Sequence, residues 1–574
     1  MASSGFAVST LAVASFGALD WAVVAIYFVG VMAVGLWAAR GQGDKRDYFL
    51  GGRELSWWVV GLSIVATETS ALTFIGVPAY CFGALSFDAS GKLVVTGGNM
   101  LFIQLIVGYV LGRIIIAAYI VPLYFNGDVY TPFQLINRAF GRQTRFAAAS
   151  IGVVGMSLGA GVRVLVSAIP VTIVMQTSWP SWTLTMSIMA IMLVALVYTA
   201  IGGIKAVVWT DMVQYFIFVG GGLFALYYIP SLLTGDRAAP SGAEGWSAVA
   251  ELSAAKLDFF RSGFLTGDAL SAAVGDSPTL AATAWAQIRN IFGGPFNIIM
   301  GIFPTTVGII LAFGFDQMNV QRVLGCRNVS EGRRAMILSA ILIFPQFLMF
   351  LLIGACLYAF YAVTGFDFGN VPPWNPAKLN PETGLGSPTA DYVFPLFIIN
   401  HVPTVLKGFL IAGLLAAAMS SVSSVLSALS SIAIIDFWRP IRGTNSTPAQ
   451  ELYLSRVATI FAGVLLVVIA FACEGAPFLL DLAFKLAGLT AGAILGAFLF
   501  GMWKKRGHAG PVIAGMTVSF FFMIIYNMTR SYTGIRWPWD APIGMLVCFA
   551  VCWLASIGLP EATERGIANG RDEG

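Results

Sequence analysis

The chain has 574 residues, of which 58% are hydrophobic and only 10% are charged. Soluble domains carry about 25% charged residues, so this composition excludes a protein whose main solvent is water. The net charge of +4 is no sign of nucleic-acid binding, because basic residues in membrane proteins are distributed by topology.

Apolar runs of about 20 residues, the length that crosses a bilayer as a helix, recur along the whole chain. They predict an all-α integral membrane protein with about 13 transmembrane helices in the lipid bilayer. The expected spans are 19–39, 57–83, 93–124, 146–176, 182–201, 207–229, 291–315, 333–361, 405–435, 452–472, 478–502, 508–529 and 541–558.

Several other classes are disfavoured by what the chain lacks. The first 21 residues, MASSGFAVSTLAVASFGALDW, carry no Lys or Arg, so a cleaved signal peptide is not expected. Six cysteines without a CxxC motif indicate neither a disulfide framework nor a metal site. Two histidines are too few for a typical haem or zinc protein.

Basic residues predict the orientation of the chain. Every odd-numbered connection is short and basic, which places it in the cytoplasm, the N-terminus outside and the C-terminus inside. The two longest connections, 230–290 and 362–404, are then extracellular. The basic residues of the odd connections are Arg40, Lys45, Arg46, Arg53, Arg138, Arg142, Arg145, Lys205, Arg322, Arg327, Arg333, Arg334, Arg439, Arg442, Lys504, Lys505 and Arg506.

Two of the expected spans are interrupted. The second contains SIVATETSALTFIG (63–76), with a polar break expected at 66–70, and the seventh contains Gly293-Gly294-Pro295 and Pro304. Interruptions at equivalent places in two halves are typical of an inverted-repeat secondary transporter whose site lies at the breaks. The alternative is that these are ordinary Gly and Pro residues, which membrane helices tolerate.

Five stretches resemble the sodium/solute symporter family, which includes sodium–glucose, proline, sialic acid and pantothenate transporters. The most specific is YTAIGGIKAVVWTDMVQ (198–214), with the pattern GG…AVxWTDxxQ. The others are WWVVGLSIVATETSALTFIG (57–76), FGFDQMNVQRVLG (313–325), AAAMSSVSSVLSALSSIAIIDFW (416–438) and GMWKK (501–505).

The resemblance implies a leucine-transporter-like core of five plus five helices within a single membrane domain, 1–574. The first repeat would cover 50–230 and the second 284–505. An additional N-terminal helix would occupy 19–44, and two additional C-terminal helices would occupy 506–560.

A first sodium site is expected where the second span breaks. A sodium ion prefers about five or six oxygen ligands, and a helix break frees carbonyls that can supply them. Serines at helical spacing on 405–435 share one face, although serines in membrane helices also serve close packing alone. The expected site, which the resemblance implies as well, comprises the carbonyls of Ala66, Thr69 and Ala417 and the hydroxyls of Ser420 and Ser421.

Asp211 lies within an apolar span, where a carboxylate needs a partner. The resemblance to family members with two sodium ions implies a second sodium site here, made of Asp211, Ser420, Ser423 and Ser424. Two sodium ions per transport cycle are therefore expected.

Arg163 is 18 residues after Arg145 and 16 before Trp179, near the middle of the fourth span. Its side chain is too short to reach water from there by extending along the helix. Two interpretations follow: a buried ion pair with Glu68 or Asp211, or a guanidinium that binds the carboxylate of a substrate.

The resemblance to sialic acid transporters implies that Ser70, Thr73 and Gln104 bind substrate together with Arg163. Glu68 departs from the sugar-transporter pattern; proline-type members carry an aspartate at this position. Phe313 would close the pocket, although such aromatic residues are more often simple packing.

These features predict a sodium-coupled symporter that imports a small polar organic solute by alternating access, with sodium ions as cofactor. A carboxylate-bearing solute such as sialic acid or another anionic sugar is favoured, with amino acids and neutral sugars as alternatives. A channel is the rival class; an enzyme is disfavoured because no nucleophile–base pair or cofactor motif occurs. The expected location is the bacterial inner membrane, as a multi-pass monomer.

Overall fold

The computed structural model describes residues 16–38, 40, 45–87, 93–125, 129–233, 242–275, 279–365, 390–442, 447–474, 479–504 and 507–559. Almost all regular structure in these ranges is helical. One antiparallel hairpin pairs β1 (Ala84–Phe87) with β2 (Leu93–Thr96).

Ten helices of the described chain are long and apolar enough to cross a membrane, or up to twelve if each of two bent pairs is one span. The membrane-spanning class predicted from composition is therefore confirmed, but the count of thirteen is not. The long helices are α1 (Ala18–Ala38), α5 (Ile103–Ile115, continuing through α6, Val121–Tyr124), α8 (Arg142–Ser178), α9 (Leu184–Ser231), α16 (Val329–Thr364), α18 (Leu406–Ile432), α20 (Pro448–Ala472), α21 (Leu479–Lys504), α22 (Ala509–Met528) and α24 (Asp540–Ala555).

The count differs partly because α9 contains two of the expected spans, 182–201 and 207–229, separated by a kink. Only Gly203–Ser231 is long enough to be counted as a span, whereas Leu184–Val197 is a shorter apolar helix. The kink lies at Gly203, whose φ of 54° is in the left-handed region that glycine adopts without strain. A Cβ at Gly203 would also lie 2.7 Å from the carbonyl oxygen of Tyr48, so the site has no room for a side chain.

Two bent pairs correspond to the two interruptions predicted from the sequence. The first broken helix consists of α3 (Trp57–Glu68) and the segment Leu72–Phe82, which includes α4 (Val77–Phe82), with a bend of 59°. The second consists of α12 (Leu280–Gly293) and the segment Ile298–Gly314, which includes α13 (Ile298–Met300) and α14 (Thr306–Gly314), with a bend of 57°.

Shorter helices connect the long ones. They are α2 (Lys45–Leu50), α7 (Phe133–Phe140), α10 (Gly242–Leu252), α11 (Asp268–Val274), α15 (Gln317–Leu324), α17 (Val393–His401), α19 (Arg439–Arg442) and α23 (Arg530–Thr533). Single 3₁₀ or π-helical turns lie at Gly51–Arg53, Leu72–Gly76, Ile116–Ile120, Ala254–Lys256, Gly301–Thr305, Ala390–Tyr392, Ala433–Trp438 and Trp537–Trp539.

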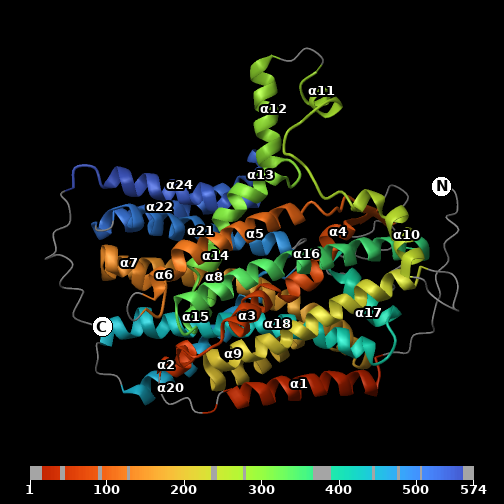
Figure 1. Cartoon of the computed structure of the whole chain (residues 1–574), viewed down its shortest axis with the longest axis horizontal. Helices are drawn as coiled ribbons and strands as arrows, with labels where there is room; N and C mark the ends of the chain where they lie inside the picture. The colour runs from red at the N-terminus through yellow and green to blue at the C-terminus, as the bar shows by residue number, and fades with distance from the viewer. Residues whose placement is uncertain are drawn as a thin grey trace.

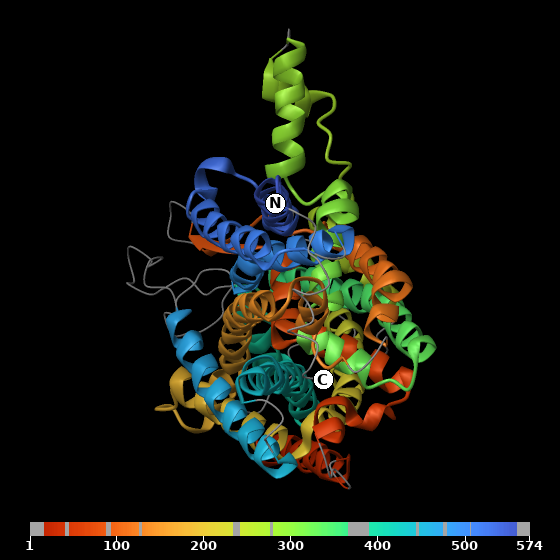
Figure 2. The ribbon, with the colours of Figure 1, turned by 90° about the vertical axis from the view of Figure 1, so that its left-hand side faces the viewer.

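The long helices run roughly along one direction, with α1 at one edge of the bundle and α22 and α24 at the other (Figure 1). Helix α18 is the most enclosed of these long helices, because 94% of its apolar 18-residue stretch is buried inside the molecule. Helices α11 and α12 project away from the bundle in both views (Figures 1 and 2). The first broken helix lies beside α18 and α9.

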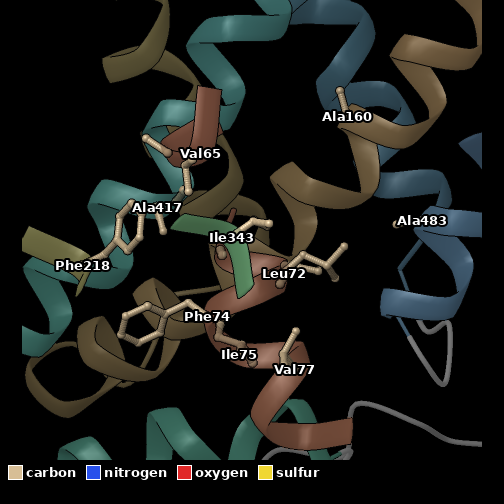
Figure 3. Packing of buried hydrophobic residues seen from close by; sticks show 14 of the residues in the cluster. Val65, Leu72, Phe74, Ile75, Val77, Ala160, Phe218, Ile343, Ala417 and Ala483 are labelled. Atoms are coloured by element: carbon tan, nitrogen blue, oxygen red, sulfur yellow. The ribbon is translucent and has the colours of Figure 1, made fainter. Parts of the chain in front are cut away.

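Apolar side chains pack tightly around the first break (Figure 3). Val65 on one side of the break, and Phe74 on the other, are completely buried, as is Ala417 of α18. The polar residues between them are therefore enclosed by an apolar shell, which raises the cost of any unsatisfied polar group there.

A glycine contact joins α5 to the second broken helix. A Cβ on Gly108 would lie 2.2 Å from the carbonyl oxygen of Gly301, so the two backbones touch directly. We expect Gly108→Ala to destabilise the protein by about 1–3 kcal/mol through overpacking. The measurement is the melting temperature of the purified protein in detergent.

The control for this variant is Gly30→Ala on α1, where a Cβ meets nothing within 4 Å. That substitution should leave the melting temperature unchanged or raise it slightly, because alanine favours a helix over glycine. Equal effects of the two substitutions would contradict the close contact between α5 and the second broken helix.

Candidate functional site

The first break frees two backbone carbonyls at the positions predicted for sodium. Helix α3 ends at Glu68, and the N–H of Ser70 turns back to the carbonyl of Glu68 at 2.9 Å instead of continuing the helix. As a result, the carbonyls of Ala66 and Thr69 accept no hydrogen bond from the described residues. Two such orphaned oxygens suit a hard cation.

The serines of α18 meet this break. Ser421 donates a hydrogen bond of 3.0 Å to the carbonyl of Thr67, which places the α18 hydroxyls directly against the broken segment. Ala417, Ser420 and Ser421 are all buried. The structure thus brings the five residues of the predicted first sodium site onto two elements in contact. Carbonyl and hydroxyl oxygens are the type of ligand that a hard cation prefers.

Asp211 of α9 is the centre of a buried polar network. Its carboxylate accepts hydrogen bonds from Ser63 at 2.6 Å, from Thr67 at 3.2 Å and from Ser420 at 2.7 Å. Arg322 of α15 completes the network with an ion pair of 2.9 Å to the same carboxylate. Neither Asp211 nor Arg322 is exposed to solvent.

Arg322 occupies the place predicted for a second sodium ion. Its guanidinium bonds Asp211 and also the hydroxyl of Ser424, two of the four expected ligands. The hydroxyl of Ser423 instead donates to the carbonyl of Ser420, at 3.1 Å. In this conformation a second sodium ion would have to displace the guanidinium.

A cavity of about 250 Å³ lies beside the first break. Five of the six residues predicted to bind substrate line it: Glu68, Ser70, Thr73, Arg163 and Phe313. The sixth, Gln104, is not among the lining residues. Its amide bonds the backbone instead, donating to the carbonyl of Phe296 and accepting from the N–H of Arg261, both at 3.1 Å.

Glu68 forms an ion pair with Arg113 of α5, a residue that the sequence reasoning did not single out. Arg113 is fully buried, and its guanidinium also lies 4.1 Å from the centre of the Phe313 ring. Phe313 therefore covers this arginine in addition to lining the cavity.

Arg163 forms neither of the ion pairs considered from the sequence, because Glu68 pairs with Arg113 and Asp211 pairs with Arg322. No carboxylate among the described residues lies within 4 Å of its guanidinium, and the side chain is half-buried at the cavity wall. Arg163 is thus a cation in the cavity wall without an ion-pair partner among the described residues.

Other polar residues of the cavity were missed by the sequence reasoning. Asp316 lines it and caps α15 by accepting a hydrogen bond of 2.8 Å from the N–H of Met318. Trp537 lines it from the connection between α22 and α24, and Asp540 lines it from the start of α24. Only the pattern Asp-Gln before a helix, an N-cap signal, could have marked Asp316 in advance.

Two broken helices that flank a cavity with charged residues in its wall, within a bundle of long apolar helices, define a secondary transporter of the multi-pass membrane class. The model of the sodium:solute symporter family matches residues 48–518, and the chain belongs to this family. It is therefore a sodium-coupled solute symporter and not an enzyme.

Relatives in this family differ in their solutes. The chain is 28% identical to the sodium/glucose cotransporter of Vibrio parahaemolyticus, covering 88% of this chain and 84% of the relative. It is 24% identical to the sodium/sialic acid symporter SiaT of Proteus mirabilis (strain HI4320), over 92% of this chain and 97% of the relative.

Solved structures show the same fold. A Na⁺-coupled sialic acid symporter in a substrate-bound outward-open state matches with a TM-score of 0.72 and 22% identity, over 95% of this chain and 99% of that one. Mhp1, a nucleobase-cation-symport-1 family transporter, matches with a TM-score of 0.50 and 12% identity, over 91% and 94% of the two chains.

The Asp211–Arg322 ion pair generates a stability prediction. Arg322→Ala leaves a buried carboxylate without its cation, and we expect it to destabilise the protein by about 3–5 kcal/mol. The double variant Asp211→Ala/Arg322→Ala should lose clearly less than the sum of the two single variants. The stability of the two single variants and of the double variant is measured as the melting temperature in detergent.

A matched control is Lys205→Ala, which removes a half-exposed partner 3.9 Å from Glu54 and should change stability by less than about 1 kcal/mol. Strict additivity of the Asp211 and Arg322 substitutions would show that the two side chains do not interact in the protein.

Proposed function

We propose that the protein imports a small polar solute bearing a carboxylate, such as sialic acid or another anionic sugar, together with sodium. Arg163 carries this proposal, because it lines the cavity and its guanidinium has no ion-pair partner among the described residues. A planar guanidinium binds a carboxylate through two parallel hydrogen bonds, which gives both affinity and orientation.

The arrangement of the other charges supports this assignment. Glu68 pairs with Arg113, and Asp211 pairs with Arg322, so neither acid forms an ion pair with Arg163. Asp316 lines the same cavity but lies beyond ion-pair distance from Arg163. A carboxylated solute would therefore supply the counter-ion that the protein itself does not place against Arg163.

Polar groups near Arg163 suit a hydroxylated solute. Ser70 and Thr73 line the cavity at the first break, and the hydroxyl of Thr73 already bonds the carbonyl of Glu68 at 3.2 Å. Ser70 is then the hydroxyl at the break that we assign to the solute. We propose no solute contact for Gln104, since its amide holds the backbone.

We propose sodium binding at the first site, through the carbonyls of Ala66, Thr69 and Ala417 and the hydroxyls of Ser420 and Ser421. A sodium ion there would supply the positive charge that satisfies the carbonyls freed by the break. Binding of the ion would order the broken segment next to the solute cavity, which links sodium to solute.

The second sodium site, at Asp211, Ser420, Ser423 and Ser424, stays a prediction. Its occupation requires Arg322 to leave Asp211 and Ser424. The ratio of sodium flux to solute flux tests whether this second site is occupied during transport. A ratio of two supports the second site, and a ratio of one indicates that only the first site couples sodium to solute. Action as a monomer in a bacterial inner membrane likewise belongs to this proposal.

We expect Arg163→Ala to reduce uptake of N-acetylneuraminic acid by about 10- to 100-fold, because charge-assisted hydrogen bonds contribute about 1.5–3 kcal/mol. Arg163→Lys should give an intermediate loss, since a lysine keeps the charge but not the two-pronged geometry. Uptake is measured in proteoliposomes under a sodium gradient, with glucose and proline as competing solutes.

Arg142→Ala is the control, because Arg142 begins the same helix and stacks on Phe146 away from the cavity. Undiminished binding of the best carboxylated solute by Arg163→Ala would overturn the proposal. Non-saturable uptake independent of the sodium gradient would instead indicate a channel.

Ser421→Ala should raise the sodium concentration that gives half-maximal thermal stabilisation by about tenfold, through loss of one oxygen ligand. This readout uses purified protein and sodium alone, so it does not depend on the solute. Ser430→Ala is the matched control on α18, since that hydroxyl donates to the carbonyl of Ser455 at 2.8 Å. The same sodium dependence in both variants would exclude Ser421 from the site.

A further inference from the structure

The connection between α22 and α24 is bonded to the bend of the second broken helix. The backbone N–H of Arg536 donates to the carbonyl of Phe292 at 2.9 Å, and its Nε donates to the carbonyl of Gly294 at 3.0 Å. Both acceptors lie at the end of α12, where the bend removes the N–H groups that a continuous helix would offer. One residue thus satisfies two of the carbonyls freed by the bend.

Aromatic side chains add further contacts between the connection and the bend. The rings of Phe292 and Trp539 stack with centres 4.1 Å apart, and those of Phe296 and Trp537 meet edge to face at 5.9 Å. The guanidinium of Arg536 lies 5.3 Å from the centre of the Phe296 ring, within the range of a cation–π interaction. Backbone and side-chain contacts therefore hold the same bend.

The two backbones also approach closely at glycines. A Cβ on Gly293 would lie 2.7 Å from the carbonyl oxygen of Gly534. This approach leaves no space for a side chain between the bend and the connection. Gly534, Arg536, Trp537 and Trp539 of the connection therefore all contact the bend.

The same connection forms part of the cavity wall. Trp537, Pro538 and Asp540 line the cavity that contains Glu68 and Arg163. One short segment therefore touches both the bend of a broken helix and the space assigned to the solute, although it belongs to neither of the two expected repeats.

The far end of the segment is anchored to the bundle. Asp540, at the start of α24, forms an ion pair with Arg530 and is almost completely buried. Its carboxylate packs against Gly488 of α21, where an added Cβ would lie 2.8 Å from a carboxylate oxygen. The segment thus has a fixed end at Asp540 and a contact at Arg536 that a movement of the bend would break.

We propose that residues 536–540 form a lid over the solute cavity, latched to the second broken helix by Arg536. The lid closes the side of the cavity nearest α12, which the sequence predicts to be extracellular. When the bend moves, Arg536 loses its two carbonyl acceptors and Trp537 leaves the cavity wall. Access from that side then depends on release of the latch.

The test measures access to Gly308, which lines the cavity and where a Cβ would meet only Ala541, at 3.8 Å. Gly308→Cys is introduced into a parent carrying Cys473→Ser, because Cys473 is the one cysteine of the described chain that is not buried. The probe is trimethylammonium-ethyl methanethiosulfonate, which does not cross membranes, applied to intact cells and to inside-out vesicles.

We expect Arg536→Ala to speed modification of Gly308→Cys by about tenfold in one of the two preparations only, through loss of charge-assisted and cation–π contacts. Trp537→Ala should have the same sided effect by removing part of the wall. Arg536→Lys keeps the charge over Phe296 but loses the Nε donor, so it should increase the modification rate by a smaller factor. This variant replaces Arg536→Ala if the alanine variant does not accumulate in the membrane.

Arg261→Ala is the matched control. Its side chain pairs with Asp258 at 2.6 Å, and only its backbone, which alanine retains, bonds the second broken helix. This variant should leave the rate unchanged. Equal rates in parent, Arg536 and Trp537 variants, or equal increases in both preparations, would overturn the lid. The outcome does not depend on which solute or how many sodium ions are transported.

Discussion

A helix that ends inside apolar surroundings leaves carbonyls without N–H donors, and the centre of this molecule is built around that constraint. At the first break, a hydroxyl of α18 satisfies the carbonyl of Thr67, while the carbonyls of Ala66 and Thr69 accept no hydrogen bond from the described residues. At the second break, Arg536 supplies donors from the protein itself. The same physical problem is therefore met in two ways: at the first break by the sodium ion that we propose, and at the second break by the backbone and side chain of Arg536.

Two buried ion pairs hold the surrounding helices to this centre. Glu68 and Arg113 join α3 to α5, and Asp211 and Arg322 join α9 to α15. Burial makes each pair costly to break from one side, because the remaining charge is left in a poorly polarisable interior. With both acids engaged, Arg163 is the cation left facing the cavity, and this division of charges is the basis of the proposed solute class.

The features predicted correctly from the sequence depend on nearby residues. Helix-breaking residues and serine spacing of three and four lie within one segment, so the two breaks and the face of α18 could be recognised. The ion pairs could not, since Glu68 and Arg113 are 45 residues apart and Asp211 and Arg322 are 111 apart. The resemblance to sialic acid transporters implied that Gln104 binds solute, whereas its amide bonds the backbone of Phe296 and Arg261. The direction of this side chain is set by packing, which one sequence does not reveal.

The internal pairing of charges has a consequence for the membrane potential. A unit charge crossing 100 mV gains or loses about 2.3 kcal/mol, whereas a neutral ion pair that moves as a unit gains nothing. The Asp211–Arg322 pair therefore contributes no net charge to the moving parts of the protein. A monoanionic solute carried with one sodium ion would cross without net charge and be driven by the chemical sodium gradient alone. The same solute with two sodium ions would also draw on the electrical gradient.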